Sequence, residues 1–317
     1  MALYLSEADI GGLLTMSDTL ETLEEMFRAR SFGEVVNRPR VRIPITAGSY
    51  NLMAAGWTER GVVGHKSYTA SAKGASFQIV LYAADGSGLL AVMGGGRISG
   101  LRTGAVTGLA ARHLAATPGA PVAIIGAGFQ ATAQVNGIIG ATGSTDIRIF
   151  ARSVERRTAF AARMAEATGC NIHAVESIEA AVDGAGVVVT ITNSAEPVLC
   201  PEDVRPGLTI VAAGNNTWLR SEIHPDVVGR CDVVVVDDVE NAKNESGELM
   251  RAAELGLFAW DSAVSLHEVI GGTRPGRTSP TQIVLAELQG IAIADVAVAA
   301  LAYRRACERG VGLELPA

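Results

Sequence analysis

Apolar and polar residues recur with different periods in different parts of the chain, and each period predicts a different kind of element. Between residues 6 and 33 the apolar positions recur at helical spacing, and Ser6 and Asp9 have the spacing of a capping box. Two short helices are expected there. Residues 40–93 instead contain segments that predict strands, separated by turns at 72–74 and 85–86: 41–43, 62–66 and 77–82.

From residue 121 onward, short apolar runs alternate with helical segments. The candidate strands are 122–126, 146–151, 187–192, 208–212 and 232–237, and the candidate helices are 129–140, 153–168, 177–183 and 240–255. This alternation predicts a parallel sheet covered on both faces. A further helix is expected from about Ser99 to Ala116, ending at Thr117-Pro118-Gly119, and the apolar closing helix at 290–309 is expected to pack on the first domain.

These patterns predict an α/β protein of two domains. Residues 119–289 are expected to form a Rossmann-type dinucleotide-binding domain, and residues 1–118 with 290–317 an α+β substrate and dimerisation domain. A homodimer is expected, because a strand-rich first domain would otherwise leave the edges of its sheet open.

Composition narrows the class of protein. The 317 residues carry a net charge of −7, which argues against a nucleic-acid partner. No apolar run approaches the ~20 residues that cross a bilayer, and the N-terminus has no signal-type segment, so a cytoplasmic protein without a membrane partner is expected. The four cysteines are far apart and predict reduced core thiols, and the histidines show no metal-ligand spacing, so no metal is assigned.

A glycine-rich turn follows the first strand of the second domain. In Gly126-Ala127-Gly128-Phe129-Gln130-Ala131, Gly126 permits a tight turn and Gly128 lets the backbone approach a pyrophosphate. Ala131 allows close packing of helix on strand, and the helix N-terminus offers free N–H groups to the phosphates. Together with the strand that follows at 146–151, this motif predicts a dinucleotide site.

The end of the second strand bears on the choice of cofactor. NAD enzymes tend to have Asp or Glu there, whereas this chain has Arg152, Ser153 and Arg156. Arginines and a hydroxyl suit a 2′-phosphate, so NADP(H) is favoured and NAD(H) remains possible. The alternative is that these arginines only begin a solvated helix.

Three cations in the first domain are candidates for holding a substrate. Arg42, Lys66 and Arg102 stand in apolar or glycine-rich surroundings, where a cation is costly unless an anion meets it. Arg102 and Thr103 are expected in the first turns of a helix of small residues, where anions are favoured. Each cation taken alone is equally well explained as a surface or interface charge.

Several of these segments together resemble the ornithine cyclodeaminase/mu-crystallin family. The resemblance rests on Gly64-His65-Lys66-Ser67-Tyr68-Thr69, Leu101-Arg102-Thr103-Gly104-Ala105, the turn at 125–131, Glu245-Ser246-Gly247-Glu248-Leu249 and Gly290-Ile291-Ala292-Ile293-Ala294-Asp295, in that order. It implies a dinucleotide domain and a substrate and dimerisation domain built from both chain ends.

The resemblance also implies roles for single residues. Arg42, Lys66 and Arg102 match positions that hold an amino-acid carboxylate, with Arg40 as a substitute for Arg42. Residues expected near the cofactor are Thr103, Thr192, Asn193 and Gly214, and segment 151–153 matches that of NADPH-using members.

One departure from the family pattern changes the expected reaction, and a second concerns the rim of the site. Cyclodeaminating members have an aspartate that engages the substrate amine, and counting back from Glu222 places Asn216 at that position. An amide cannot act as a base. Glu287-Leu288 also replaces a pair that is commonly Lys-Ser. Asp295 begins a helix, which is enough to explain it, although its family position leaves a site role open.

The expected function is therefore an imine or ketimine reductase, or equally an amino-acid dehydrogenase acting in reverse. Arg42 and Arg102 would clamp the carboxylate of a small 2-imino or 2-amino acid, and Lys66 would bond the carboxylate or the imine nitrogen. The proton would come from Lys66 or from a bound water. The alternatives are an ornithine cyclodeaminase with bound NAD and a non-catalytic protein that binds NADPH and a small ligand.

Overall fold

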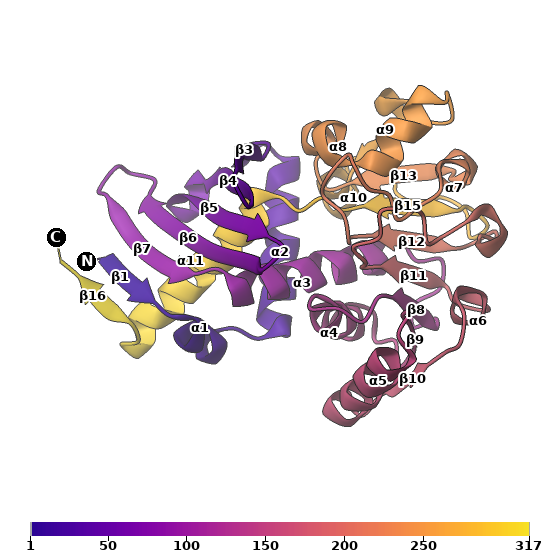
Figure 1. The fold of residues 1–317 in the computed structure, drawn as a ribbon. Helices are drawn as coiled ribbons and strands as arrows, with labels where there is room; N and C mark the ends of the chain where they lie inside the picture. Colours follow the sequence, from indigo (N-terminus) through magenta and orange to yellow (C-terminus); the bar gives the residue numbers. More distant parts are fainter. Residues whose placement is uncertain (1, 317) are drawn as a thin grey trace. The chain divides into compact units, whose positions relative to one another are not determined.

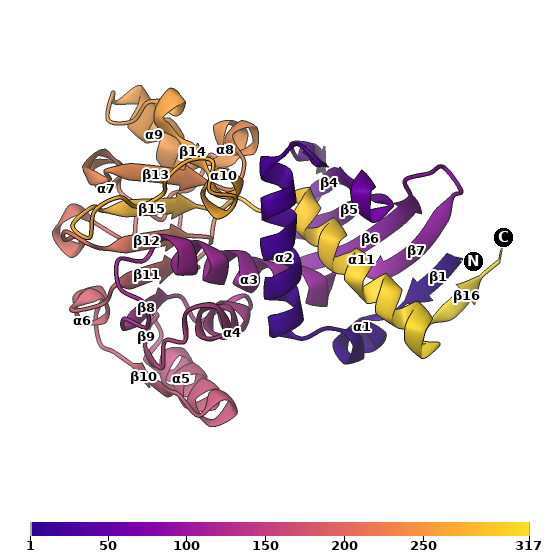
Figure 2. The same cartoon turned by 180° about the vertical axis from the view of Figure 1, so that it is seen from behind.

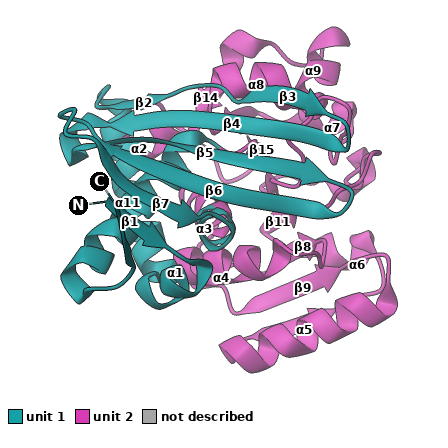
Figure 3. Cartoon of the chain, turned by 60° about the vertical axis from the view of Figure 1, so that its left-hand side comes forward, with its two compact units in different colours: residues 1–102, 291–317 teal, residues 103–290 magenta. Residues whose placement is uncertain are grey.

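The computed structural model describes residues 2–316 and divides the chain into two compact units. Unit 1 contains residues 1–102 and 291–317, and unit 2 contains residues 103–290 (Figure 3). Both chain ends thus contribute to unit 1. The first boundary falls inside a helix rather than at the turn of Thr117-Pro118-Gly119, because that helix continues into the packing of unit 2.

Unit 1 is built on one mixed sheet. Its strands have the order β16-β1-β7-β6-β5-β4-β2, with β3 paired to β4, and all pairs are antiparallel except β1 with β7. The strands are β1 (Ala2–Leu5), β2 (Val35–Asn37), β3 (Val41–Ile45), β4 (Gly48–Trp57), β5 (Val62–Ser71), β6 (Gly74–Ala83), β7 (Leu89–Gly94) and β16 (Leu313–Leu315). Of these, β1, β2, β4, β7 and β16 were not among the predicted strands.

Helices pack on one face of this sheet. They are α1 (Glu7–Leu13), α2 (Met16–Ser31) and α11 (Ala292–Arg309), and η1 (Thr58–Arg60) is a short 3₁₀ turn. Figure 2 shows α11 running across the strands with α2 beside it. The N-terminal half of α11 is almost entirely buried, which a helix of Ala, Ile and Val allows. The capping box predicted at Ser6 and Asp9 is confirmed at the start of α1.

Unit 2 is built on a parallel sheet of strand order β10-β9-β8-β11-β12-β15-β13-β14 (Figure 1). Its strands are β8 (Val122–Ile125), β9 (Asp146–Phe150), β10 (Asn171–Ala174), β11 (Val187–Thr190), β12 (Thr209–Ala212), β13 (Val233–Val236), β14 (Val264–Ser265) and β15 (Val284–Glu287). The central strands are buried along their whole length, as expected of a sheet covered on both faces. The order outward from β8 is that of a Rossmann fold, which confirms the predicted fold class.

The helices of unit 2 include α7 (Pro225–Arg230) and α10 (Leu266–Ile270), which were not predicted, and they differ from prediction most clearly at 240–255. The others are the later part of α3 (Gly96–Leu114), α4 (Ala131–Thr142), α5 (Val154–Thr168), α6 (Ile178–Val182), α8 (Val239–Glu245) and α9 (Gly247–Glu254), with 3₁₀ turns η2 (Pro201–Asp203) and η3 (Trp260–Ser262). The single helix expected at 240–255 is wrong. Ser246 takes an extended conformation and its hydroxyl accepts from the N–H of Leu249, so it ends α8 and caps α9.

Helices α3 and α4 cross at very short distance inside unit 2. A Cβ on Gly104 would lie 2.0 Å from the carbonyl oxygen of Ala133, and one on Gly137 would lie 1.9 Å from the carbonyl oxygen of Gly104. Only glycine fits at these two positions. The small residues of α3 therefore serve helix packing as well as any ligand.

Two further expectations concern the surface. Cys307 is exposed and the other three cysteines are half-buried, so the prediction of core thiols is wrong for Cys307, which lies on the outer side of α11. Within residues 2–316, no helix combines the length and the apolar character needed to span a membrane.

Candidate active site

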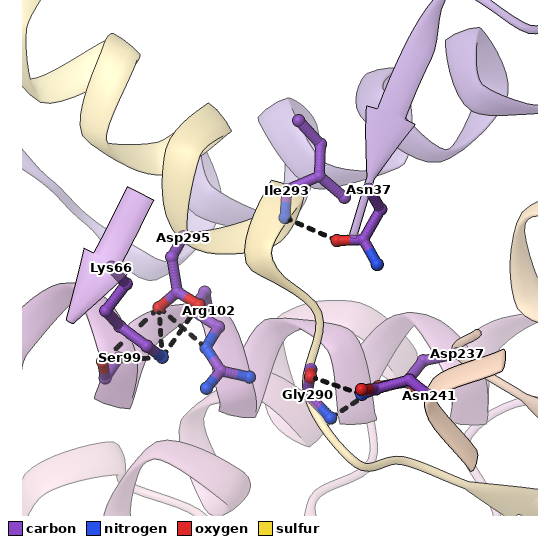
Figure 4. Close-up of polar contacts among 9 residues, drawn as sticks. All are labelled: Asn37, Lys66, Ser99, Arg102, Asp237, Asn241, Gly290, Ile293 and Asp295. Carbon is purple, nitrogen blue, oxygen red and sulfur yellow. Dashed lines mark hydrogen bonds and ion pairs between the residues drawn. The ribbon is translucent and has the colours of Figure 1, made fainter. Parts of the chain in front are cut away.

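A buried ion cluster lies inside unit 1, where α11 meets the sheet and the start of α3. Lys66 on β5 is 1% exposed, and its Nζ lies 2.8 Å and 2.9 Å from the two carboxylate oxygens of Asp295 on α11 (Figure 4). Arg102 on α3 donates from Nε to the same carboxylate at 3.1 Å. Ser99 completes the cluster, 3.4 Å from both Nζ and Oδ1.

The cluster shifts the pKa values of its members. Burial lowers the pKa of Lys66 to about 7, assisted by the charge of Arg102 and opposed by Asp295. Burial acts to raise the pKa of Asp295, but Arg102 and Lys66 outweigh it, so that this pKa lies below its usual value. Asp295 is therefore ionised at neutral pH, while Lys66 exists in both protonation states.

Arg102 is only partly engaged by this cluster. Its Nε bonds Asp295, and its two terminal nitrogens donate no hydrogen bond to the described residues. In Figure 4 they point away from the carboxylate. A guanidinium held at Nε, with its other two nitrogens directed outward, is suited to bind a second carboxylate.

The N-terminus of α11 is held in place by β2. The side-chain oxygen of Asn37 accepts a hydrogen bond from the backbone N–H of Ile293 at 3.2 Å (Figure 4). This bond satisfies one of the free N–H groups in the first turn of α11. Because Asp295 lies in the same turn, the bond also fixes the position of its carboxylate.

The other predicted cations lie on or next to the edge strand β3. Arg42 is exposed and its Nε donates to the side-chain oxygen of Asn51 on β4 at 3.0 Å. Arg40 is half-buried, and its charge contributes to the lowered pKa of Lys66. Of these two arginines, Arg40 is thus the one whose charge reaches the Lys66 cluster.

The N-terminus of α3, near which the sequence predicts an anion site, is occupied by a carboxylate of the chain itself. This helix begins at Gly96, three residues earlier than expected, and the carboxylate of Glu7 accepts hydrogen bonds from the N–H groups of Gly96 and Arg97 at 2.6 Å and 2.9 Å. The helix terminus is already capped by an acid of α1. Arg102 follows in the second turn, and its side chain rather than the helix end is the group that a ligand could meet.

Unit 2 contains a cavity of about 560 Å³ at the carboxyl ends of β8, β9 and β11. The predicted cofactor residues that line it are Gly126, Gly128, Phe129, Gln130, Arg152, Ser153, Arg156, Thr192, Asn193 and Gly214. Ligands of open α/β sheets bind at this edge, beside the point where strand order reverses. Among the predicted cofactor residues, Ala131 and Thr103 are not part of its lining.

The glycine-rich turn has the shape that a dinucleotide requires. Gly126 has a φ of 127°, and a Cβ there would lie 2.4 Å from the carbonyl oxygen of Ile191. Gly128 lines the cavity and has open space where its Cβ would be. Ala131 is 1% exposed and begins α4. The turn therefore brings bare backbone and a helix N-terminus to one wall of the cavity.

The two arginines after β9 are exposed, whereas the hydroxyl of the serine between them is already hydrogen-bonded within the chain. Arg152 and Arg156 are exposed at the rim of the cavity. Ser153 caps α5: its hydroxyl accepts from the N–H of Arg156 at 3.2 Å and donates to Glu155 at 2.9 Å. Both charges are thus available to a phosphate, while the hydroxyl already has two partners.

The loops after β11 and β12 hold the remaining predicted residues. Thr192 and Asn193 follow β11 and Gly214 follows β12, and all three line the cavity. Asn216 is exposed in the loop after β12 and is not part of the cavity lining.

Comparison with known proteins identifies the family. The family model of the ornithine cyclodeaminase/mu-crystallin family matches residues 2–310. The chain belongs to that family. The resemblance inferred from the short motifs is thereby confirmed, over nearly the whole length.

Relatives within this family carry different names. A Delta(1)-pyrroline-2-carboxylate reductase of Bacillus cereus is 32% identical over 224 residues, covering 70% of this chain and 69% of the relative. An "uncharacterized cyclodeaminase" of Sinorhizobium fredii is 28% identical, with 97% of each chain covered. The structure of the Thermococcus litoralis Delta(1)-pyrroline-2-carboxylate reductase with NADH and L-proline superposes with a TM-score of 0.93 at 26% identity, covering 99% of this chain and 100% of that one.

Sequence reasoning left open the role of Asp295, the central anion of the unit 1 cluster. The helix dipole was enough to explain Asp295, and its two cationic partners were found without it. The sequence also gave no role to Glu222, Glu248 and Glu287, which are buried in unit 2. One signal could have found Glu287: it ends an apolar strand, where a charge is costly without a partner.

Proposed function

We propose that the protein is an NAD(P)H-dependent reductase of small 2-imino acids. The observation that carries this proposal is the buried Lys66–Asp295–Arg102 cluster of unit 1, in a chain whose unit 2 has a dinucleotide cavity. In the reaction a hydride adds to the carbon of the C=N bond and a proton adds to its nitrogen, which gives an amino acid. The amino-acid dehydrogenase reaction is the same step in reverse.

Arg102 and Lys66 are the groups proposed to hold the substrate carboxylate. One carboxylate of the chain, Asp295, balances only one of these two positive charges, so an acid group of a ligand would neutralise the other. Arg102 offers its two terminal nitrogens for a bidentate bond. Arg40 would strengthen the attraction from its position near Lys66.

Lys66 is also proposed to supply the proton to the imine nitrogen. Its pKa of about 7 lets it give up a proton under neutral conditions, and Asp295 holds its Nζ in a fixed direction. The protonated form is needed for reduction and is lost as the pH rises through 7. Reduction is therefore expected to slow above pH 7, and amino-acid oxidation, which needs the neutral amine, to become faster.

The residues around the unit 2 cavity fit a nicotinamide dinucleotide. Gly126, Gly128 and the N-terminus of α4 would hold the pyrophosphate, and Thr192 and Gly214 would lie near the nicotinamide. When bound, this cofactor supplies the hydride. We propose a preference for NADPH, because Arg152 and Arg156 are exposed at the rim; replacing both with alanine should raise the KM for NADPH about 10-fold or more and leave that for NADH nearly unchanged.

A homodimer is proposed because unit 1 has an edge strand with exposed apolar side chains. Apolar side chains of its edge strand β3 are exposed, with values of 55% for Val41, 52% for Ile43 and 42% for Ile45. A second copy would remove such an edge from water. Sedimentation equilibrium tests the proposal, with a dimer as the expected species.

The proposed reaction is tested with the purified protein, NADH or NADPH, and a panel of imines. Delta(1)-pyrroline-2-carboxylate, and pyruvate with ammonia or methylamine, should consume the reduced cofactor and yield the amino acid, measured by absorbance and by mass spectrometry. Ammonia release from ornithine without net cofactor consumption would instead identify a cyclodeaminase, although Asn216 offers no base for it. Cofactor binding without turnover of any imine would identify a binding protein.

A further inference from the structure

Glu222 lies in the segment after β12 and is completely buried in unit 2. Its Oε1 accepts hydrogen bonds from both the backbone N–H and the hydroxyl of Thr192, each at 2.6 Å. Its Oε2 accepts from the backbone N–H of Gly214 at 2.7 Å. One carboxylate thus joins the loop after β11 to the loop after β12.

These two loops form one wall of the dinucleotide cavity. Thr192 and Gly214 line it, whereas Glu222 lies behind them and is not part of the lining. The two loops pack closely at Gly214, where a Cβ would lie 2.3 Å from the carbonyl oxygen of Thr192 and 2.4 Å from Oε2 of Glu222. No side chain fits between the loops, and the carboxylate bonds both of them just beyond the last pair of the sheet, Thr190 and Ala212.

We propose that Glu222 is a positioning residue whose ionised carboxylate holds the two loops together, so that cofactor affinity depends on its charge. The inference rests on the proposed cofactor site of unit 2. A carboxylate can accept all three hydrogen bonds, because it has only acceptor sites. In a protonated carboxyl group or an amide, one of the two terminal atoms is a hydrogen-bond donor. That donor would face a backbone N–H group, so the hydrogen bond to at least one of the two loops would be lost.

The groups around Glu222 raise its pKa into the neutral range, so its carboxylate gains and loses a proton near pH 7. Burial raises the pKa of Glu222 to about 7, and the nearby carboxylate of Glu248 on α9 contributes, against the hydrogen bonds of Thr192 and Gly214. Oε1 of Glu248 also accepts from the backbone N–H of Glu222 at 2.5 Å. Glu287 at the end of β15 adds a further acid.

Two more charged groups lie at the edge of this acidic cluster. Arg251 faces Glu248 from the next turn of α9, and Asp237 faces Glu287 from the end of β13. The carboxylates outnumber the cations here, so the proton on Glu222 is held more firmly than on an isolated glutamate.

The test is the dissociation constant of NADH, measured by fluorescence between pH 6 and pH 8. NADH has no phosphate monoester, whereas the 2′-phosphate of NADPH titrates in this range. With a pKa of about 7, the ionised fraction of Glu222 falls about tenfold from pH 8 to pH 6, so the dissociation constant should rise about tenfold. Glu222→Gln should bind weakly at both pH values and show no such rise.

A second variant gives a shift that a merely structural role would not produce. Glu248→Gln keeps an acceptor for the N–H of Glu222 but removes a charge that raises its pKa, so the midpoint of the transition should move to lower pH. Hydrogen exchange of residues 190–216 in the cofactor-free protein provides an independent measurement. Protection of the Thr192 and Gly214 amides should be lower at pH 6 than at pH 8, after correction for the intrinsic rate.

The outcomes separate the two proposals. Wild-type protein that binds no NADH or NADPH at any pH would overturn the proposed function, while the exchange data would still decide the role of Glu222. Tight binding with no dependence on pH, the same dependence in Glu222→Gln, or an unmoved midpoint in Glu248→Gln would overturn the inference and leave the function standing. If Glu222→Gln does not fold, the wild-type profile and the midpoint of Glu248→Gln decide between these outcomes.

Discussion

Replacing Asp295 with asparagine removes the carboxylate that pairs with Lys66 and Arg102 while keeping the size of the side chain. The ammonium of Lys66 is 2.8 Å from that carboxylate and 1% exposed, so it loses its counterion without gaining water. Breaking a buried ion pair in this way costs about 3–5 kcal/mol, because an uncompensated charge stays behind. The free energy of unfolding should fall by up to this amount, and most at low pH, where Lys66 of the variant still carries its proton.

The cost should become smaller at higher pH. Lys66 has a pKa of about 7, and without Asp295 that pKa falls further, so above pH 7 the buried amine escapes the penalty by losing its proton. The unfolded chain keeps the ordinary lysine pKa, so the variant gains stability relative to the wild type as the pH rises from its own lowered Lys66 pKa to about 7, and above pH 7 the difference stays constant. At pH 9 the remaining loss should be about 1–2 kcal/mol, the value of the lost hydrogen bonds to Lys66 and Arg102.

The assay is urea unfolding at pH 6 and pH 9, followed by tryptophan fluorescence. A chain of two units can unfold in steps, so a probe in unit 1 is required. Trp57 is buried in unit 1, and Trp218 and Trp260 of unit 2 can be replaced by phenylalanine in all samples. The unfolding midpoint of unit 1 then reports the stability around Asp295.

The matched control is Glu59→Gln, which also removes an acid from the first turn of a helical segment of unit 1, but at the exposed turn η1. Its cost should be about 0.3–1 kcal/mol, the value of a helix-dipole interaction, at both pH values. A loss for Asp295→Asn as small as that of the control, or equal at pH 6 and pH 9, would refute the argument. Asp295 would then be no more than a helix-terminal acid.

Two further predictions concern packing and thiol chemistry. Gly104→Ala should destabilise the protein by at least about 2 kcal/mol, because its Cβ would lie 2.0 Å from the carbonyl oxygen of Ala133. Gly100→Ala in the same helix has open space and should leave the stability unchanged or raise it. Thermal denaturation of the two variants measures the difference. Cys231 is half-buried and burial raises the pKa of its thiol to about 12, so in the native protein it should react with Ellman's reagent much more slowly than the exposed Cys307. Equal rates would contradict this.

The parallel sheet could be predicted because its buried strands are short apolar runs between turn residues. Strands such as Val122–Ile125 and Val187–Thr190 are buried at every position, and short apolar runs bounded by turn residues are typical of strands covered on both faces. Strand Val284–Glu287 was missed although it is central, because it ends in a glutamate, which breaks the apolar pattern. Strand Gly48–Trp57 contains Gly, Ser and Asn, and is fixed by its two antiparallel neighbours rather than by its own residues.

The site could be predicted in part, for a similar reason. Lys66 and Arg102 were found because a cation in apolar or glycine-rich surroundings is costly and requires a partner. The partner itself was not found, because Asp295 is 229 positions away from Lys66 and its own surroundings already explain an acid. Only the packing of α11 on the sheet brings the two together.

The central claim is that Lys66 and Arg102 hold the acid group of an imine that the protein reduces. The most direct test compares kcat/KM for Delta(1)-pyrroline-2-carboxylate with kcat/KM for the same ring imine lacking the carboxylate, using wild-type protein and Arg102→Met. A charged hydrogen-bonded contact contributes about 1.5–3 kcal/mol, so the wild type should prefer the carboxylated imine about 10- to 100-fold or more, and Arg102→Met should lose most of that preference. Equal rates with the two imines, or a preference that survives in Arg102→Met, would contradict it.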